Sequence, residues 1–203
     1  MGYLLAIAAG YLLGSSNMAY WVSLVKKVDI RANGTGNLGA SNATVLLGWG
    51  AGVLVAVHDI GKAFVAVLLA KWLFPGLENV GAAAGVACVL GHIFPFYLKF
   101  KGGKGLASYI GMLIALDLRV ALAAVVLLVA VTLITDFIAL GTLSVSVVGP
   151  LGLFLLGHGL MTLVILGVAT AVIFVKHQDN LVRIRNKTEI GLMSTIKGEN
   201  RMK

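Results

Sequence analysis

Long apolar runs, such as the one over residues 51–74, constrain most strongly what this chain can fold into. Hydrophobic residues make up 59% of the 203 residues and charged residues only 12%, whereas an ordinary soluble domain carries about 25% charged residues. A helix needs about 20 mostly apolar residues to cross a bilayer. We therefore expect a single all-α integral membrane domain over residues 1–203, with little sequence left for a soluble domain.

Basic residues are concentrated in three segments that separate the apolar runs. The first contains Lys26, Lys27 and Arg31, the second contains Lys99, Lys101 and Lys104, and the third lies within residues 176–203. The positive-inside rule assigns all three segments to the cytoplasmic face. Polar breaks at residues 117–119, 135–136 and 157–159 divide the sequence between the second and third segments into four short runs. We therefore predict about seven short transmembrane helices, with the N-terminus outside and the C-terminus in the cytoplasm.

The two ends of the chain are predicted to differ. The first apolar run, residues 3–25, is expected to form one retained helix rather than a signal sequence, because basic residues follow it instead of preceding it. Residues 190–203 are expected to form a flexible basic tail. The net charge of +8 does not indicate nucleic-acid binding, since no soluble domain is left to present an element to a groove.

The first basic segment contains the glycine-rich sequence RANGTGNLGASNATVLLG, residues 31–48. Its glycines match the dinucleotide fingerprint G-x-G-x-x-G, but that fingerprint needs a βαβ unit, which membrane helices on both sides exclude. Glycines expose backbone N–H groups that, with short polar side chains, form an anion-binding nest. The candidates are Gly34, Thr35, Gly36, Asn37, Gly39, Ser41 and Asn42. The alternative is a polar turn that joins two helices.

The second segment reads GHIFPFYLKFKGGKG, residues 91–105. It is not a Walker A loop, because glycine rather than serine or threonine follows Lys104. We expect glycines to open space around Lys104, so that its ammonium binds phosphate oxygens. The other phosphate-binding candidates are Lys101, Gly102 and Gly103, while Lys99, and alternatively Lys101, would face lipid headgroups. His92 is either a further ligand-binding residue or a satisfied buried histidine.

The third segment, HQDNLVRIRNKTE, covers residues 177–189. His177, Asn180 and Arg183 recur every three residues and therefore share one face of a helix that extends into the cytoplasm. Such a stripe either faces solvent or closes a substrate site, and we favour the second interpretation because all three basic segments are predicted to share one membrane face.

Two ionisable residues lie inside the second span. Asp59 and Lys62 are neighbours on one helix turn. Ionisable groups in a membrane are costly unless they are paired or face a cavity. We predict an ion pair that supports the site, with direct ligand contact as the alternative. The neighbouring His58 is given no role.

These motifs together resemble a known family. GTGNLGASN, the Asp59-x-x-Lys62 pair, GHIFP followed by KGGKG, and H-x-x-N-x-x-R followed by Thr188-Glu189 are similar to the bacterial acyl-phosphate:glycerol-3-phosphate acyltransferases of the PlsY type, over roughly residues 3–190. The resemblance implies a seven-span enzyme of the bacterial plasma membrane with a cytoplasmic active site. It implies transfer of a fatty acyl group from acyl phosphate to the sn-1 hydroxyl of glycerol 3-phosphate, which gives lysophosphatidic acid and phosphate.

The resemblance also implies roles for individual residues. Lys104, Thr35, His177 and Asn180 would be catalytic, and Arg183 and Glu189 would join the substrate-binding residues. No cofactor or metal is expected. The expected partners are acyl phosphate, glycerol 3-phosphate and membrane lipids, with a functional link to an enzyme that makes acyl phosphate.

The chain departs from the family pattern at three positions. Val45 stands where the family usually has arginine, Thr35 where it usually has serine, and Lys187 where it commonly has glycine. Either Arg31 or Lys187 could replace the missing charge. Two alternatives therefore stay open, namely a paralogue that acylates another acceptor and a lipid-binding or transport protein without catalysis.

Overall fold

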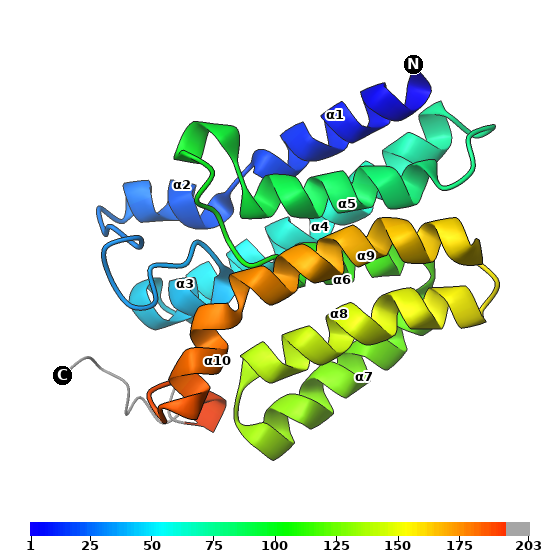
Figure 1. Cartoon of the computed structure of the whole chain (residues 1–203). Helices are drawn as coiled ribbons and strands as arrows, with labels where there is room; N and C mark the ends of the chain where they lie inside the picture. The colour runs from blue at the N-terminus through cyan, green and yellow to red at the C-terminus, as the bar shows by residue number, and fades with distance from the viewer. Residues whose placement is uncertain (194–203) are drawn as a thin grey trace. The chain divides into compact units, whose positions relative to one another are not determined.

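The computed structural model describes residues 1–193, which fold into helices joined by turns and loops (Figure 1). Residues 194–203, which contain Lys197, Arg201 and Lys203 and most of the predicted tail, lie outside the described residues. The chain divides into two compact units, Met1–Leu118 and Arg119–Lys203. A single domain over residues 1–203 stays a prediction.

Unit 1 contains the N-terminal helices of the chain. Its elements are α1 (Gly2–Ser15), α2 (Met18–Val25), α3 (Ala40–Leu47), α4 (Trp49–Leu73), α5 (Val80–Ile93), the 3-10 turn η1 (Phe96–Leu98) and α6 (Leu106–Leu116). Helix α1 lies along α5 (Figure 1), where a Cβ atom on Gly10 or Gly14 would collide with the backbone of Ala84 or Cys88. Glycines therefore let the two helix backbones approach closely, as is usual in membrane proteins.

The predicted single helix over residues 3–25 is wrong, because the chain breaks between α1 and α2. The Ser16 hydroxyl donates to the Leu13 carbonyl at 2.7 Å. The Asn17 side chain accepts the Tyr20 N–H at 2.9 Å and caps the start of α2. These local bonds end one helix and begin the next, and they turn the Ser16 carbonyl toward the Lys62 ammonium, 2.7 Å away.

Unit 2 contains the remaining helices. They are α7 (Leu118–Thr135), which starts at the boundary between the units, α8 (Ile138–Leu155), α9 (Gly159–Lys176) and α10 (Gln178–Arg185). The predicted breaks at residues 117–119, 135–136 and 157–159 coincide with the ends of these helices. Helix α8 is joined to α9 by the Thr170 hydroxyl, which donates to the Ser146 carbonyl at 2.6 Å.

Within residues 1–193, five helical segments are long and apolar enough to cross a bilayer, namely Trp49–Leu73, Val80–Leu98, Leu118–Thr135, Ile138–Leu155 and Gly159–Lys176. Trp49 and Trp72, near the two ends of α4, are 65% and 75% exposed. They are separated by about 34 Å along the helix, so each could lie in one of the two interfaces that tryptophan prefers. An all-helical membrane protein is thus confirmed, whereas the count of seven spans and the orientation stay predictions.

Candidate active site

The side chain of Asn42 organises the first glycine-rich loop. Its amide nitrogen donates to the carbonyls of Ile30 and Asn37, each at 3.1 Å. Its amide oxygen accepts the Thr35 N–H at 3.1 Å. Asn42 is only 3% exposed, so the loop is wrapped around it. These bonds point to a role in shaping the loop, and contact of Asn42 with phosphate stays a prediction.

The outer surface of this loop carries the other candidates. Gly34 and Gly36 adopt positive φ angles of 60° and 67°, which L side chains rarely adopt. Both glycines are exposed, as are Thr35 and Ser41. Together with the half-buried Asn37 and Gly39, they form the glycine-rich surface that the sequence predicted.

A short helix, α3, follows directly within the predicted loop. It begins after Gly39, which provides no side-chain hydrogen bond to the first turn. Backbone N–H groups at a helix start attract anions, because they lack helical partners and carry the positive end of the helix dipole. Residues 34–42 therefore present backbone donors as well as hydroxyl groups.

The GGKG loop is packed against the end of α5. The Gly102 N–H donates to the Ile93 carbonyl at 3.0 Å, and the Gly103 N–H donates to the His92 carbonyl at 3.1 Å. A Cβ atom on Gly102 would collide with the His92 carbonyl oxygen. The glycines thus allow close packing. The expectation that they open space around Lys104 is wrong for Gly102, whose side-chain position is filled by the His92 carbonyl.

The lysines of this loop differ in exposure. Lys104 is half-buried, whereas Lys99 and Lys101 are exposed. Lys104 precedes Gly105, whose φ of 98° starts α6. One turn into α6, the Ser108 hydroxyl is buried and has no hydrogen-bond partner in the described part of the chain. Ser108 was not among the predicted site residues, although its position four residues after Lys104 would place it one helical turn away.

The two glycine-rich segments meet at Gly103. A Cβ atom there would lie 3.0 Å from the Leu38 carbonyl oxygen. That carbonyl also lies 3.5 Å from the amide nitrogen of Asn17. Unit 1 therefore brings together the two predicted phosphate-binding segments, far apart in the sequence.

A buried polar network lies behind the GGKG loop. The Lys62 ammonium lies 2.7 Å from Asp59 Oδ1, 2.7 Å from the Ser16 carbonyl oxygen and 3.0 Å from His92 Nδ1. An ammonium group has three hydrogens to donate, so these three acceptors satisfy it. This arrangement supports the predicted ion pair over direct ligand contact.

His58 also belongs to this network, although no role was predicted for it. Its Nδ1 lies 3.3 Å from Asp59 Oδ1 and its Nε2 lies 3.2 Å from the Ser16 hydroxyl. The signal in the sequence was the adjacent Asp59, but spacing on a straight helix directs neighbouring side chains apart. The break after α1 supplies the hydroxyl that brings His58 into contact.

In unit 2, Glu189 holds two of the predicted site residues. The Asn180 amide donates to one carboxylate oxygen at 2.5 Å, and Arg183 Nε donates to the other at 2.6 Å. Arg183 Nη2 is buried without a hydrogen-bond partner among the described residues. The Thr-Glu sequence thus orients the polar face of α10, and it leaves one guanidinium nitrogen for a further acceptor.

His177 lies at the junction of α9 and α10 and is 4% exposed. Its Nδ1 lies 2.8 Å from the Ile173 carbonyl oxygen. A carbonyl only accepts, so Nδ1 carries the hydrogen, and in the neutral ring Nε2 is an acceptor. The ring is therefore fixed in the form that can accept a hydrogen bond from a hydroxyl group.

Position 45, where the family usually has arginine, is occupied by a valine that is 40% exposed on α3. The guanidinium of Arg31 lies over the ring of Tyr20 at 5.6 Å. Lys187 is exposed and adopts a positive φ of 59°. The two candidates to replace the missing charge thus lie in different units.

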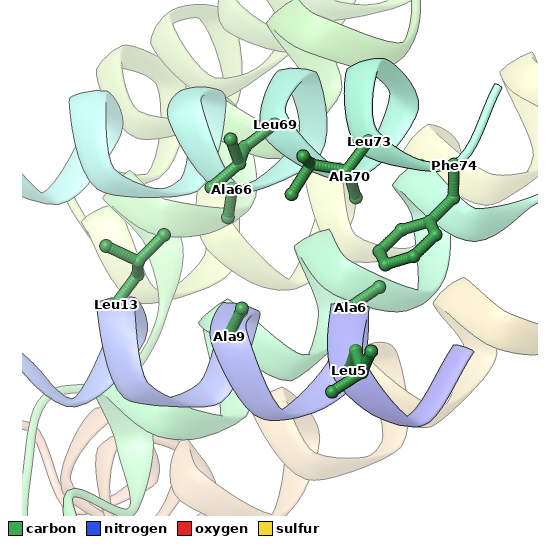
Figure 2. A pocket seen from close by; sticks show the side chains of 10 residues that line it. Leu5, Ala6, Ala9, Leu13, Ala66, Leu69, Ala70, Leu73 and Phe74 are labelled. Atoms are coloured by element: carbon green, nitrogen blue, oxygen red, sulfur yellow. The ribbon is translucent and has the colours of Figure 1, made fainter. Parts of the chain in front are cut away.

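An apolar cavity of about 260 Å³ lies between α1 and α4 in unit 1 (Figure 2). Its labelled side chains are Leu5, Ala6, Ala9, Leu13, Ala66, Leu69, Ala70, Leu73 and Phe74. None of the predicted site residues lines it. Residues 1–193 contain no group of three or more His, Cys, Asp or Glu side chains that could hold a metal ion.

Comparisons with known proteins identify the family that this chain resembles. A family model described as glycerol-3-phosphate acyltransferase matches residues 4–187. Glycerol-3-phosphate acyltransferase 1 of Oceanobacillus iheyensis is 34% identical to this chain, and the aligned region covers 96% of this chain and 97% of the relative. A glycerol-3-phosphate acyltransferase of Coxiella burnetii is 36% identical over 93% of this chain and 97% of its own.

A solved structure is also similar. The crystal structure of PlsY, an integral membrane glycerol 3-phosphate acyltransferase, in its glycerol 3-phosphate form, superposes with a TM-score of 0.90 at 32% identity. The match covers 96% of this chain and 97% of that one. The lysophosphatidic acid form of the same protein gives a TM-score of 0.86, with coverage of 94% and 95%.

Proposed function

The chain belongs to the glycerol-3-phosphate acyltransferase family, and we propose that it transfers a fatty acyl group from acyl phosphate to the sn-1 hydroxyl of glycerol 3-phosphate. The products are lysophosphatidic acid and inorganic phosphate. The observation that carries this proposal is the contact at Gly103 between the GGKG loop and the loop that Asn42 shapes. The contact brings the Lys104 loop to the glycine-rich loop whose α3 starts with uncapped backbone N–H groups, and an ammonium beside such donors suits substrates that each carry a phosphate group.

The reaction needs no cofactor. The hydroxyl oxygen attacks the acyl carbonyl carbon, the bond between that carbon and the phosphate oxygen breaks, and the hydroxyl proton passes to the departing phosphate. The protein's contribution is to hold both substrates and stabilise negative charge. We assign this charge stabilisation to Lys104 and to the Thr35 hydroxyl and the backbone donors beside it.

The phosphate-binding residues proposed in unit 1 surround these groups. They are Gly34, Gly36, Asn37, Gly39, Ser41, Lys101, Gly102 and Gly103. Asn42 and His92 act through the loops that they hold, as an alternative to the direct contact predicted from the sequence.

In unit 2, we propose that His177 and Asn180 contact a substrate. The acceptor nitrogen of His177 suits the glycerol hydroxyl, and the Asn180 amide is held by Glu189. Arg183 Nη2 is a buried donor that suits a phosphate oxygen. Glu189 would thus act on the substrate through its two neighbours.

For the membrane topology, we propose seven spans in the bacterial plasma membrane, with the N-terminus outside, and the C-terminus and active site at the cytoplasmic face. The supporting observations are the three basic segments and the two tryptophans near the ends of α4. Helix α6, with 11 residues, rises only about 16 Å, so it would need a thinned bilayer or a re-entrant course.

The donor implies a further partner. Acyl phosphate is a reactive anhydride, so an enzyme that forms it must supply this protein. An acyl-CoA or acyl-carrier-protein donor is disfavoured, since the acyltransferases that use such donors have an H-x-x-x-x-D pair and no histidine of this chain has aspartate five residues later.

The test is a reconstituted reaction. Purified protein in nanodiscs is incubated with palmitoyl phosphate and glycerol 3-phosphate, and phosphate release and lysophosphatidate are followed together. We expect both products in equal amounts, and only when the acceptor is present. Acylation of another hydroxyl compound in preference to glycerol 3-phosphate would support the paralogue that Val45 suggests. No acceptor-dependent product with any acyl chain would refute the enzyme assignment.

A further inference from the structure

The buried network behind the GGKG loop contacts one edge of the His92 ring. Lys62 can only donate, and its ammonium lies 3.0 Å from His92 Nδ1. The same nitrogen lies 3.4 Å from Asp59 Oδ1, so the Nδ1 edge of the ring faces both members of the ion pair. The Lys62 ammonium is held in turn by Asp59 Oδ1 and by the Ser16 carbonyl.

The other side of the same ring lies against the GGKG loop. A Cβ atom on Gly103 would collide with His92 Nε2. The backbone of His92 also accepts the Gly103 N–H at 3.1 Å. His92 therefore contacts Gly103 through its side chain and its backbone, and Gly103 is bonded directly to Lys104.

Direct contact of these two side chains with substrate is disfavoured by their burial. His92 is 3% exposed and Lys62 is 7% exposed. The three donors of Lys62 already have acceptors, and Gly103 lies against the Nε2 edge of His92. The network can therefore affect the reaction only through the position of the loop.

We propose that Lys62 and His92 are positioning residues for the phosphate-binding loop. Asp59 and the Ser16 carbonyl hold the Lys62 ammonium, Lys62 holds the ring of His92, and the ring fixes Gly103 and with it the backbone of Lys104. The catalytic meaning of this inference rests on the proposed function of that loop.

The test compares two substitutions of His92 that separate the edges of the ring. In His92→Asn, the shorter amide reaches the position of Nδ1, so Lys62 keeps an acceptor but Gly103 loses its neighbour. In His92→Gln, the longer amide reaches the position of Nε2, so Gly103 keeps its neighbour but Lys62 loses an acceptor. His158→Asn, in the turn between α8 and α9, is the matched control.

Two quantities are measured on each protein in nanodiscs. One is backbone hydrogen exchange of the peptide over residues 99–105 without substrate, and the other is the pair kcat and KM with palmitoyl phosphate and glycerol 3-phosphate. We expect His92→Asn to raise both loop exchange and the KM for glycerol 3-phosphate about tenfold, because the packing of the ring against Gly103 is lost. His92→Gln should stay closer to wild type in both, while its melting temperature falls further.

If His92→Asn has the faster loop exchange while His92→Gln has the lower melting temperature, His92 positions the loop and does not merely stabilise the fold. If loop exchange simply follows the melting temperature across the two variants, or stays at the wild-type value in His92→Asn, the proposal is overturned. If both single variants fail to fold, the neutral pair Asp59→Asn with Lys62→Met decides, and wild-type loop exchange in that folded variant overturns the proposal. Because exchange is measured without substrate, a failure of acyl transfer in the wild-type protein would refute the proposed function and leave this result standing.

Discussion

Replacing Asn42 with alanine should release the first glycine-rich loop. The change removes three side-chain hydrogen bonds of 3.1 Å, to the Ile30 and Asn37 carbonyls and from the Thr35 N–H, and a longer one of 3.5 Å to the Asn33 carbonyl. A protein hydrogen bond contributes about 1 kcal/mol net, so the shaped loop loses about 3 kcal/mol relative to its released forms. If phosphate binds only the shaped loop, kcat/KM for glycerol 3-phosphate should fall about a hundredfold.

The assay is steady-state acyl transfer in nanodiscs, with the melting temperature measured on the same preparation. Asn33→Ala is the matched control, because its amide makes one exposed bond, to the Asp29 carbonyl at 2.8 Å, and its loss should cost about twofold. The reasoning is refuted if folded Asn42→Ala keeps kcat/KM within about threefold of wild type. It is also refuted if both variants lose activity equally.

Three further changes test single groups. Lys104→Ala should lower kcat at least about a hundredfold at an unchanged melting temperature, whereas exposed Lys99→Ala should not; near-normal turnover of the first variant would contradict its role. Glu189→Gln should lower kcat/KM about tenfold, because the charge-assisted bond to α10 is weakened, and Glu78→Gln, in the turn before α5, is the control that should keep full activity. Val45→Arg should lower the KM for glycerol 3-phosphate about tenfold, and an unchanged or higher KM would mean that the charge is supplied elsewhere.

The spans could be predicted because their boundaries coincide with changes in composition. A polar or glycine-containing break, as at residues 157–159, stands out between apolar runs and marks the end of a helix. The break at Ser16 and Asn17 also lies in a polar run, GSSN, but the apolar residues on both sides of it have the combined length of one span, which predicts a single helix. Its two side-chain bonds end α1 and start α2. Helix α3 was missed for a related reason, since its eight residues lie inside a glycine-rich loop.

The residue types of the candidate site predicted its kind of chemistry, but they did not predict what each side chain contacts. An amide, an imidazole and a lysine in basic loops indicate anion chemistry, which the family match supports. What each side chain faces depends on contacts between distant residues. Asn42 faces backbone of its own loop, and His92 faces Lys62, thirty residues earlier in the sequence.

A glycine in a sequence is compatible with two different structural reasons, an unusual backbone angle and close packing, which the sequence alone does not distinguish. Glycine is needed where the backbone turns with positive φ and also where another group approaches the backbone closely. Gly105 is of the first kind, with a φ of 98°. Gly103 is of the second kind, because the ring of His92 and the Leu38 carbonyl oxygen occupy the space of a side chain. In the KGGKG segment, Lys104 thus lies on a loop that is packed from two sides. If Lys104 binds phosphate as proposed, this packing limits the backbone entropy that is lost on binding.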